Sequence, residues 1–147
     1  MDIWEDMYNK AKKEYHREDV SPFIVAHHVV AAVESEDGKI FTGFCIESAS
    51  GVMNLCAERV AALNMYINTG KTKIKRLIVF RDNPPHNGGM PCGACREFLM
   101  QLDKANKNME ILLFSLVKEY KEQNIIWELN TKKKRENVFS FKIKKFL

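Results

Sequence analysis

The chain has 147 residues, of which 46% are hydrophobic and 29% are charged, and its formal net charge is +4. This length suits one globular domain with a single core, and we expect residues 1–147 to form one. The sequence lacks an apolar run near the ~18 residues of a membrane-spanning helix, and its acidic, amphipathic N-terminus is not typical of a secretion signal. We therefore expect a cytoplasmic protein that does not bind membranes.

The positive charge is concentrated at the C-terminus. Residues 131–147 hold seven lysines or arginines against one glutamate, a net charge of +6, which leaves −2 for the rest of the chain. A basic tail on a mildly acidic body can contact nucleic acid, but such a segment is more often a solvated edge. We expect the second case, without a nucleic-acid partner.

The first half of the chain predicts a helix, a strand hairpin and a second helix. Two strands are expected within residues 23–48, joined at Asp37-Gly38, a strong hairpin signal. The second helix is expected over residues 54–68 and to stop at Gly70. The first helix is expected over residues 3–15, where apolar side chains recur at helical spacing at Ile3, Trp4, Met7, Tyr8 and Ala11.

The second half predicts strands that alternate with a helix. A buried strand is expected at residues 74–82, followed by a loop rich in proline and glycine and by a third helix that begins at Pro91 to Cys92. Residues 109–117 are expected to form a central strand, and residues 124–130 and 138–143 are weaker strand candidates. Consecutive strands separated by helices should run parallel. This order predicts an α/β fold, a three-layer α/β/α domain with a central mixed sheet.

The four cysteines are Cys45, Cys56, Cys92 and Cys95. Two disulfides would need a secreted context, whereas Cys-x-x-Cys with a third cysteine in a cytosolic protein is typical of a metal site. Cys56 and Cys92 both lie at a predicted helix start, where the helix dipole favours the thiolate form. Zinc prefers tetrahedral sulfur and nitrogen ligands, and a catalytic zinc keeps its fourth position for water. We predict that Zn²⁺ is bound by Cys56, Cys92 and Cys95.

Charged residues accompany these cysteines. Glu58 follows Cys56 by two residues, so its carboxylate can approach the same cavity and take a proton from water whose pKa zinc lowers to ~7. We predict Glu58 as the catalytic proton shuttle. Three thiolates and Zn²⁺ sum to −1, and Arg59 and Arg96 are placed to offset that charge. Cys-x-Glu followed at a distance by Pro-Cys-x-x-Cys is the pattern of zinc deaminases that act on cytosine or adenine.

The segments "CAERVA" and "PCGACREFL", with the preceding "AAVESEDGKIFTGFCIESAS", resemble the cytidine deaminase family over about residues 22–116. The resemblance implies that the three cysteines bind zinc, that Glu58 moves the proton and that the backbone of Ala57 faces the base. Water would attack C4 of the pyrimidine and ammonia would leave. The resemblance also implies a homotetramer. A cysteine as first ligand is similar to the branch that acts on free nucleosides.

The sequence departs from the family where the sugar should bind. The family usually has Asn-x-Glu-Asn, of which the asparagine and the glutamate hold the ribose, and this chain has "CIES" at residues 45–48. Glu47 is thus kept, while Cys45 replaces the asparagine and cannot offer an amide donor and acceptor. His27 and His28 stand where the family tends to have Phe-Pro, and adjacent strand residues face opposite sides. Whether either histidine reaches the pocket is left open.

These features predict the hydrolytic deamination of cytidine or deoxycytidine to uridine or deoxyuridine. One alternative is a deaminase for a modified cytosine nucleoside such as blasticidin S, suggested by the altered region around Cys45. Another is a zinc-stabilised binding module without catalysis, whose basic tail at residues 131–147 would bind nucleic acid. The zinc could also be purely structural, with Cys45 as a fourth ligand that closes the site. An inactive relative of the enzymes also remains open.

Overall fold

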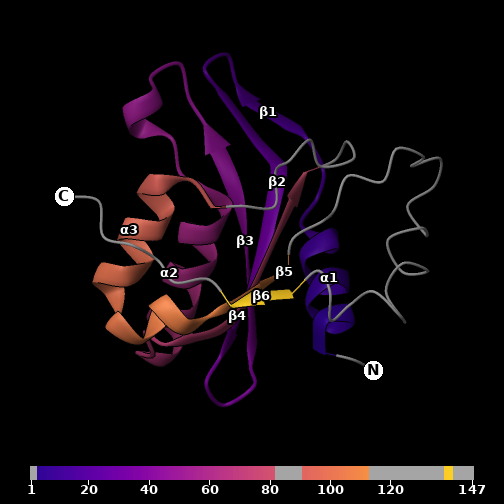
Figure 1. Ribbon diagram of the computed structural model, residues 1–147. Helices are drawn as coiled ribbons and strands as arrows, with labels where there is room; N and C mark the ends of the chain where they lie inside the picture. The colour runs from indigo at the N-terminus through magenta and orange to yellow at the C-terminus, as the bar shows by residue number, and fades with distance from the viewer. Residues whose placement is uncertain (1–2, 82–90, 113–137, 141–147) are drawn as a thin grey trace.

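The computed structural model describes residues 3–81, 91–112 and 138–140, which form a sheet with helices on both faces (Figure 1). None of the helices in these ranges is long and apolar enough to cross a membrane. The helices are α1 (Ile3–Lys13), α2 (Ala57–Thr69) and α3 (Gly93–Leu102), with short 3-10 helices η1 (Gly51–Met53) and η2 (Lys104–Asn108). The strands are β1 (Glu18–Ser21), β2 (Ile24–Ser35), β3 (Ile40–Glu47), β4 (Ile74–Arg81), β5 (Glu110–Leu112) and β6 (Val138–Ser140).

The sheet is mixed, as the sequence predicts. Strand β2 pairs antiparallel with β3 on one side and with β4 on the other, and β1 pairs with the first residues of β2. Strand β4 pairs parallel with β5, and β5 pairs antiparallel with β6. Because β3 and β4 are both antiparallel to β2, they run in the same direction, with β2 between them. The parallel prediction is therefore correct, although β3 and β4 are not neighbours.

Both faces of the sheet are buried, which confirms the three-layer α/β/α architecture. Residues of β2 alternate between the two faces, as a strand requires. On one face α1 packs against the sheet, in a cluster that includes Met7, Tyr8, Ala11, Val30, Ala32 and Ile78. On the other face α2 and α3 cover it, in a cluster that includes Ala31, Val33, Ala61, Met65, Leu77 and Leu99.

Most predicted elements are present with shifted ends. Gly38 has φ 85° in the hairpin turn and Gly70 has φ 70° at the end of α2, so both predicted turns are confirmed. Helix α1 ends at Lys13, two residues before its predicted end. Helix α2 begins at Ala57 and not at residue 54, because Leu55 is held extended by a bridge to Ile46. Helix α3 begins at Gly93, directly after the predicted start.

Strand β1 was not predicted, because all four of its residues are exposed and show no apolar alternation. Of the predicted strand at residues 109–117, residues 110–112 form β5, and residues 113–117 lie outside the described residues. Of the candidate at residues 138–143, residues 138–140 form β6. The predicted loop at residues 83–90, the candidate strand at residues 124–130 and the rest of the basic tail also lie outside the described residues.

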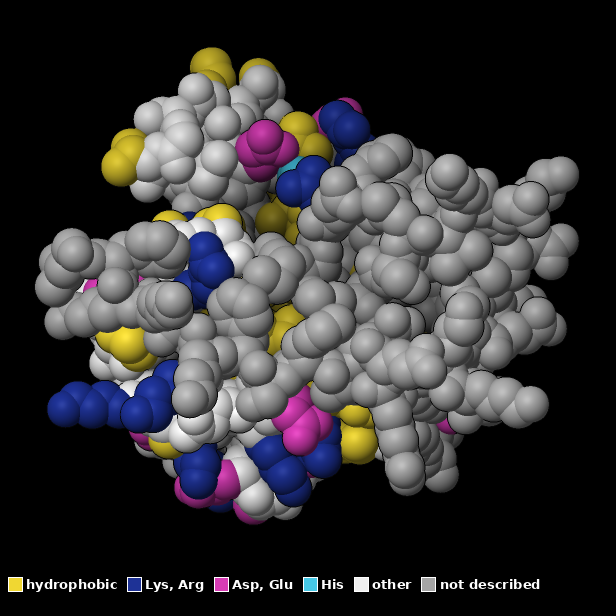
Figure 2. Space-filling view, in the orientation of Figure 1, with side chains coloured by type: hydrophobic (Ala, Val, Ile, Leu, Met, Phe, Trp, Pro, Cys, Tyr) yellow, Lys and Arg dark blue, Asp and Glu magenta, His cyan; other side chains and the backbone are white. Residues whose placement is uncertain are grey.

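Apolar side chains are exposed in and after η1. Val52 is 92% exposed, Met53 62% and Leu55 41%. Figure 2 shows yellow side chains projecting at the upper left of the molecule, on the side where the segment between β3 and α2 lies in Figure 1. Exposed apolar side chains that gather in one place are common at protein contacts. The homotetramer implied by the family resemblance stays a prediction.

Helix α2 lies directly against β3 at Gly43. A Cβ atom at this position would lie 2.6 Å from the carbonyl oxygen of Ala57 and 2.9 Å from the Cα of Ala61. These atoms belong to the helix backbone, so they cannot move aside as a flexible side chain would. The missing side chain of Gly43 therefore sets how closely the first turns of α2 approach the sheet.

Replacing Gly43 by alanine should destabilise the protein by about 3 kcal/mol, at the upper end of the range for overpacked cores. The Cβ would push against the backbone of α2, so the loss should appear in the free energy of unfolding measured by urea denaturation. Gly51→Ala is the matched control, because nothing lies within 4 Å of a Cβ at Gly51. Equal stability of the two variants would show that α2 does not depend on this contact.

Candidate metal and active site

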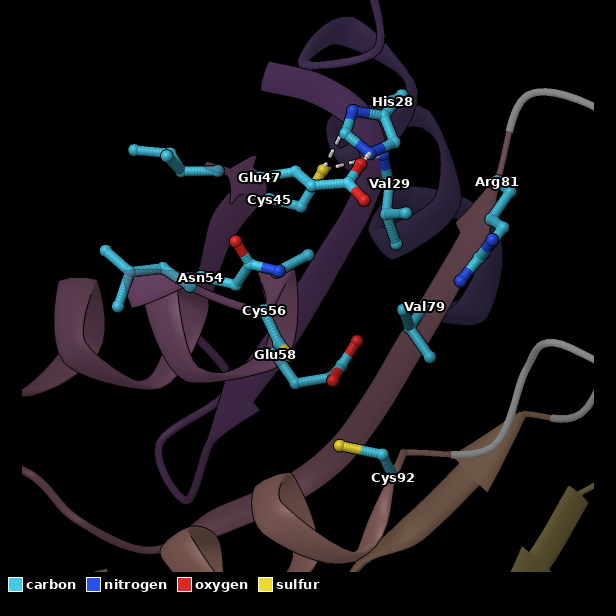
Figure 3. Close-up of a pocket in the computed structure, with 13 residues that line it drawn as sticks. His28, Val29, Cys45, Glu47, Asn54, Cys56, Glu58, Val79, Arg81 and Cys92 are labelled. Atoms are coloured by element: carbon cyan, nitrogen blue, oxygen red, sulfur yellow. Dashed lines mark hydrogen bonds and ion pairs between the residues drawn. The ribbon is translucent and has the colours of Figure 1, made fainter. Parts of the chain in front are cut away.

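A pocket of about 290 Å³ lies where β3, β4 and two helix starts meet (Figure 3). This volume is close to the lower end for small-molecule sites. Strands β3 and β4 run in the same direction and are followed by α2 and α3, so both helices begin at the same edge of the sheet. The pocket is lined by His28, Val29, Cys45, Ile46, Glu47, Asn54, Leu55, Cys56, Ala57, Glu58, Val79, Arg81 and Cys92. Six of the predicted site residues are among them.

The three predicted zinc ligands come together. The sulfur atoms of Cys56, Cys92 and Cys95 lie within 4.8 Å of one another. Cys56 and Cys92 are the N-cap residues of α2 and α3, with extended backbones, and neither side chain makes a capping hydrogen bond. Their thiols are thus available to a ligand. Cys45 does not belong to this group, and all four cysteines are free, so neither the disulfides nor a fourth cysteine ligand is found.

The thiols of this cluster differ in acidity. Burial raises the pKa of the Cys95 thiol far above its usual value, and the nearby Glu58 carboxyl raises it further. Burial also raises the pKa of Cys92, but hydrogen bonds from the backbone N–H groups of Cys95 and Ala94 and from the Cys95 side chain outweigh it, so the net pKa is lowered. A soft divalent cation replaces thiol protons when it binds. Three clustered sulfurs at two helix starts are a donor set that fits zinc.

Arg59, a predicted supporting cation, contacts the cluster. The Nη2 of Arg59 donates to the sulfur of Cys56 at 3.3 Å and to the carbonyl oxygen of Asn54 at 3.5 Å. The hydrogen bond to Cys56 is the main cause of the raised pKa of Arg59. Arg96 follows Cys95 in α3, and its backbone N–H donates to the carbonyl oxygen of Cys92 at 3.0 Å. A supporting charge from Arg96 stays a prediction.

Glu58 is buried beside the sulfurs. It is the second residue of α2, is 6% exposed and points into the pocket (Figure 3). Burial raises the pKa of its carboxyl group, while a hydrogen bond with the Cys95 side chain and the charges of Arg59 and Arg81 act in the opposite direction. A buried carboxyl group with a raised pKa in a pocket is a common feature of general acid–base sites.

At the end of the pocket away from Cys92, three polar side chains contact one another. The Nε2 of His28 lies 2.9 Å from Oε2 of Glu47, and its Nδ1 lies 3.3 Å from the sulfur of Cys45. His27 points to the opposite face, where its ring stacks on Phe44 with centroids 3.7 Å apart. The structure thus places His28 in the pocket, which the sequence left open.

Two polar lining residues were missed by the sequence reasoning. Asn54 was assigned to the predicted helix, but it precedes α2, and its Oδ1 accepts a hydrogen bond from the backbone N–H of Ser48 at 2.7 Å. Arg81 ends β4 and lines the pocket. A charged residue at the carboxyl end of a buried strand was the available signal for Arg81.

A second group of possible ligands lies outside the pocket. The donor atoms of His16, Glu18 and His27 are also within 4.8 Å of one another. However, the two histidine rings stack with centroids 3.9 Å apart and an interplanar angle of 25°. Ring nitrogens bind a metal in the plane of the ring, and the planes of stacked rings do not meet at a nearby point. The cysteine cluster is the better metal site.

Residues 2–109 match the family model described as "Cytidine and deoxycytidylate deaminase zinc-binding region". A cytidine deaminase of Mycoplasma pneumoniae is 33% identical over 97 residues, which are 65% of this chain and 70% of that protein. The crystal structure of cytidine deaminase from Burkholderia pseudomallei has a TM-score of 0.56 and 28% identity, and covers 75% of this chain and 83% of its own.

A blasticidin-S deaminase of Bacillus cereus is also similar, with 28% identity over 81 residues, 50% of this chain and 56% of that protein. The family model spans most of the chain and includes the cysteine cluster and Glu58. This chain therefore belongs to the cytidine and deoxycytidylate deaminase zinc-binding family.

Proposed function

We propose that the chain is a zinc-dependent hydrolase that converts cytidine or deoxycytidine, with water, to uridine or deoxyuridine and ammonia. The observation that carries the proposal is the pocket itself, in which a buried carboxyl group lies beside three clustered thiols. The similar proteins named cytidine deaminase support the choice of substrate.

In this proposal Cys56, Cys92 and Cys95 hold Zn²⁺. Bound zinc supplies a Lewis acid that lowers the pKa of water toward ~7, so that the nucleophile is available at neutral pH. Arg59 offsets negative charge on the cluster through its hydrogen bond to Cys56. Proton transfer and substrate binding would be carried out by the protein groups around the substrate.

Glu58 moves the protons. Its carboxylate would accept a proton from the attacking water at one oxygen and deliver it to the departing amino group, so that ammonia leaves C4 of the base. The oxygen of the water stays on C4, and its second proton ends on N3 of the product. Burial raises the pKa of Glu58 above that of an exposed carboxyl group, which suits a group that both takes up and releases a proton. Ala57 is buried and lines the pocket, and its backbone would face the base.

The base and the sugar would then occupy opposite ends of the pocket. If C4 of the pyrimidine lies beside Glu58, the sugar extends toward Glu47, which lies at the other end with Cys45 and His28 (Figure 3). Glu47 is 61% exposed at its side chain, so its carboxylate is accessible to a ligand. We assign Glu47 to the sugar.

A second candidate substrate is a modified cytosine nucleoside such as blasticidin S. Two observations favour it as the alternative: Cys45 replaces the usual asparagine at the sugar end, and a blasticidin-S deaminase is among the similar proteins. A purely structural zinc module is less well supported, because it gives no role to a buried carboxyl group in an open pocket.

The zinc-loaded protein should lower the ultraviolet absorbance of cytidine or deoxycytidine in a continuous assay. Blasticidin S is tested in parallel at the same enzyme concentration. Turnover of blasticidin S alone would select the second candidate substrate. Absence of turnover with all three compounds, with one zinc bound per chain, would contradict the proposed reaction.

Zinc should protect Cys92 from alkylation. In chelator-treated protein the exposed, more acidic Cys92 should react with iodoacetamide before the buried Cys45 and Cys95, whose pKa values are raised chiefly by burial. One equivalent of Zn²⁺ should slow the Cys92 reaction at least about tenfold, as measured by peptide mass spectrometry. An unchanged rate would mean that Cys92 is not a zinc ligand.

Glu58→Gln should abolish turnover and keep the metal. Removal of general acid–base catalysis alone lowers rates by ~10²–10⁴-fold, and the amide fills the same buried space without a transferable proton. Zinc content by atomic emission and turnover by absorbance are measured on the same preparation. Glu97→Gln, on α3, is the control, because Glu97 does not line the pocket. A Glu58→Gln variant with wild-type kcat would exclude the proposed role.

A further inference from the structure

A continuous chain of hydrogen bonds runs from the sheet to the rim of the pocket. The backbone N–H of Val29 donates to the sulfur of Cys45 at 3.2 Å. The sulfur lies 3.3 Å from Nδ1 of His28, and Nε2 of the same ring lies 2.9 Å from Oε2 of Glu47. Figure 3 shows these contacts at the end of the pocket opposite Cys92.

The direction of the chain follows from the chemistry of its members. Burial raises the pKa of Cys45, so the group is a thiol at neutral pH and has a hydrogen to donate. The S–H can then donate to Nδ1 of His28, which places the proton of the neutral imidazole on Nε2. The Nε2–H donates to the carboxylate of Glu47. Each acceptor in the chain thus has a donor, from the backbone N–H of Val29 in the strand to the carboxylate of Glu47 at the rim of the pocket.

The backbone at this point is adapted to the contact. The pairing of β2 with β3 shifts register between Ala26 and Val30. His27 in this segment has φ 64°, a backbone conformation that residues other than glycine rarely adopt. A bulge re-aims the side chains around it. As a result, His28 and Val29 both line the pocket although they are consecutive, while His27 faces the opposite side. Strained backbone of this kind is concentrated at functional sites.

The hydrogen-bonded chain holds in place a side chain that is largely exposed. The side chain of Glu47 is 61% exposed, whereas that of His28 is 22% exposed and is held from its other nitrogen by Cys45. Among the described residues, His28 is the partner of the Glu47 carboxylate through Oε2, which leaves Oε1 for a ligand. An acceptor held in position before binding costs less conformational entropy when the ligand arrives.

We propose that His28 is a specificity-determining residue, which with Cys45 holds the Glu47 carboxylate ready to accept a hydrogen bond from a sugar hydroxyl of the substrate. The Cys45–His28 pair thereby replaces the amide that this chain lacks at position 45. The inference rests on the proposed function, because it places the sugar at this end of the pocket. It assigns the substrate to nucleosides whose sugar carries a free 2′- or 3′-hydroxyl donor.

The test compares KM for cytidine and for 2′,3′-dideoxycytidine, which keeps the 5′-hydroxyl but lacks the 2′- and 3′-hydroxyl donors. His28→Leu should raise the KM for cytidine about tenfold, the effect of one hydrogen bond to a charged group, and leave kcat and the KM for the dideoxynucleoside nearly unchanged. His28→Gln, which can still donate to Glu47 and accept from Cys45, should keep most of the preference for cytidine. His16→Gln is the matched control, because His16 lies outside the pocket.

A double-mutant cycle tests the connection to Glu47. Glu47→Ala should also remove the preference for cytidine, and adding His28→Leu to it should have little further effect, because both changes break the same chain. If His28→Leu fails to fold, Cys45→Ala breaks the chain one link earlier and Cys45→Ser preserves it. A cytidine preference that survives in His28→Leu, or effects of the two substitutions that add in full, would overturn the inference.

Binding measurements separate this inference from the proposed reaction. Isothermal titration calorimetry of the zinc-loaded protein with cytidine and with 2′,3′-dideoxycytidine needs no turnover. A preference for cytidine that His28→Leu abolishes would support the role of His28 even if the wild-type protein deaminated neither compound. Equal affinity of the wild-type protein for both nucleosides would contradict the role of His28, whatever the outcome of the activity assay.

Discussion

The pocket depends on the direct contact between the backbone of α2 and β3. At Gly43 the sheet has no side chain, so the carbonyl oxygen of Ala57 and the backbone of Ala61 can come close to the strand. Ala57 is the first residue of α2, and its neighbours Cys56 and Glu58 are therefore fixed in height above the sheet. Ala57 and Ala61 are buried between α2 and the sheet, so a larger side chain at either position would push the helix away from β3.

Helix α3 is positioned by a different device. Asn106 is fully buried, and its side-chain amide donates to the carbonyl oxygens of Leu99 at 2.9 Å and Thr72 at 3.0 Å. Its Oδ1 accepts from the backbone N–H of Ile74 at 2.7 Å. These bonds join the last turns of α3 to the first residue of β4. With α2 fixed on β3 and α3 fixed to β4, the two helix starts meet, and the three cysteine sulfurs converge without a capping role for the thiols of Cys56 and Cys92.

The part of the site that the sequence predicts is local in the chain. Cys56 and Glu58 lie within one turn of α2, and Cys92 and Cys95 within one turn of α3, so their spacing alone indicates that they can share a site. The hairpin at Gly38 and the end of α2 at Gly70 were equally predictable, because each needs a positive φ that glycine adopts freely. The start of α2 was placed too early, because the bridge from Leu55 to Ile46 is a contact between distant segments.

The end of the pocket that we assign to the sugar could not be predicted for the same reason. Regular alternation along β2 indicates that His27 and His28 face opposite sides, but it does not say which one faces the pocket. The shift in register after Ala26 decides this, and a bulge has no reliable signal in one sequence. In the sequence, Cys45 in place of asparagine indicates only the loss of an amide donor and acceptor. In the structure its sulfur lies between the backbone N–H of Val29 and the ring of His28, within a chain of hydrogen bonds. A site can thus keep its reaction centre in short motifs while its substrate preference depends on contacts between residues that are far apart in the chain. We infer such specificity residues by following the hydrogen bonds along the pocket, here from Glu47 through His28 to the strand.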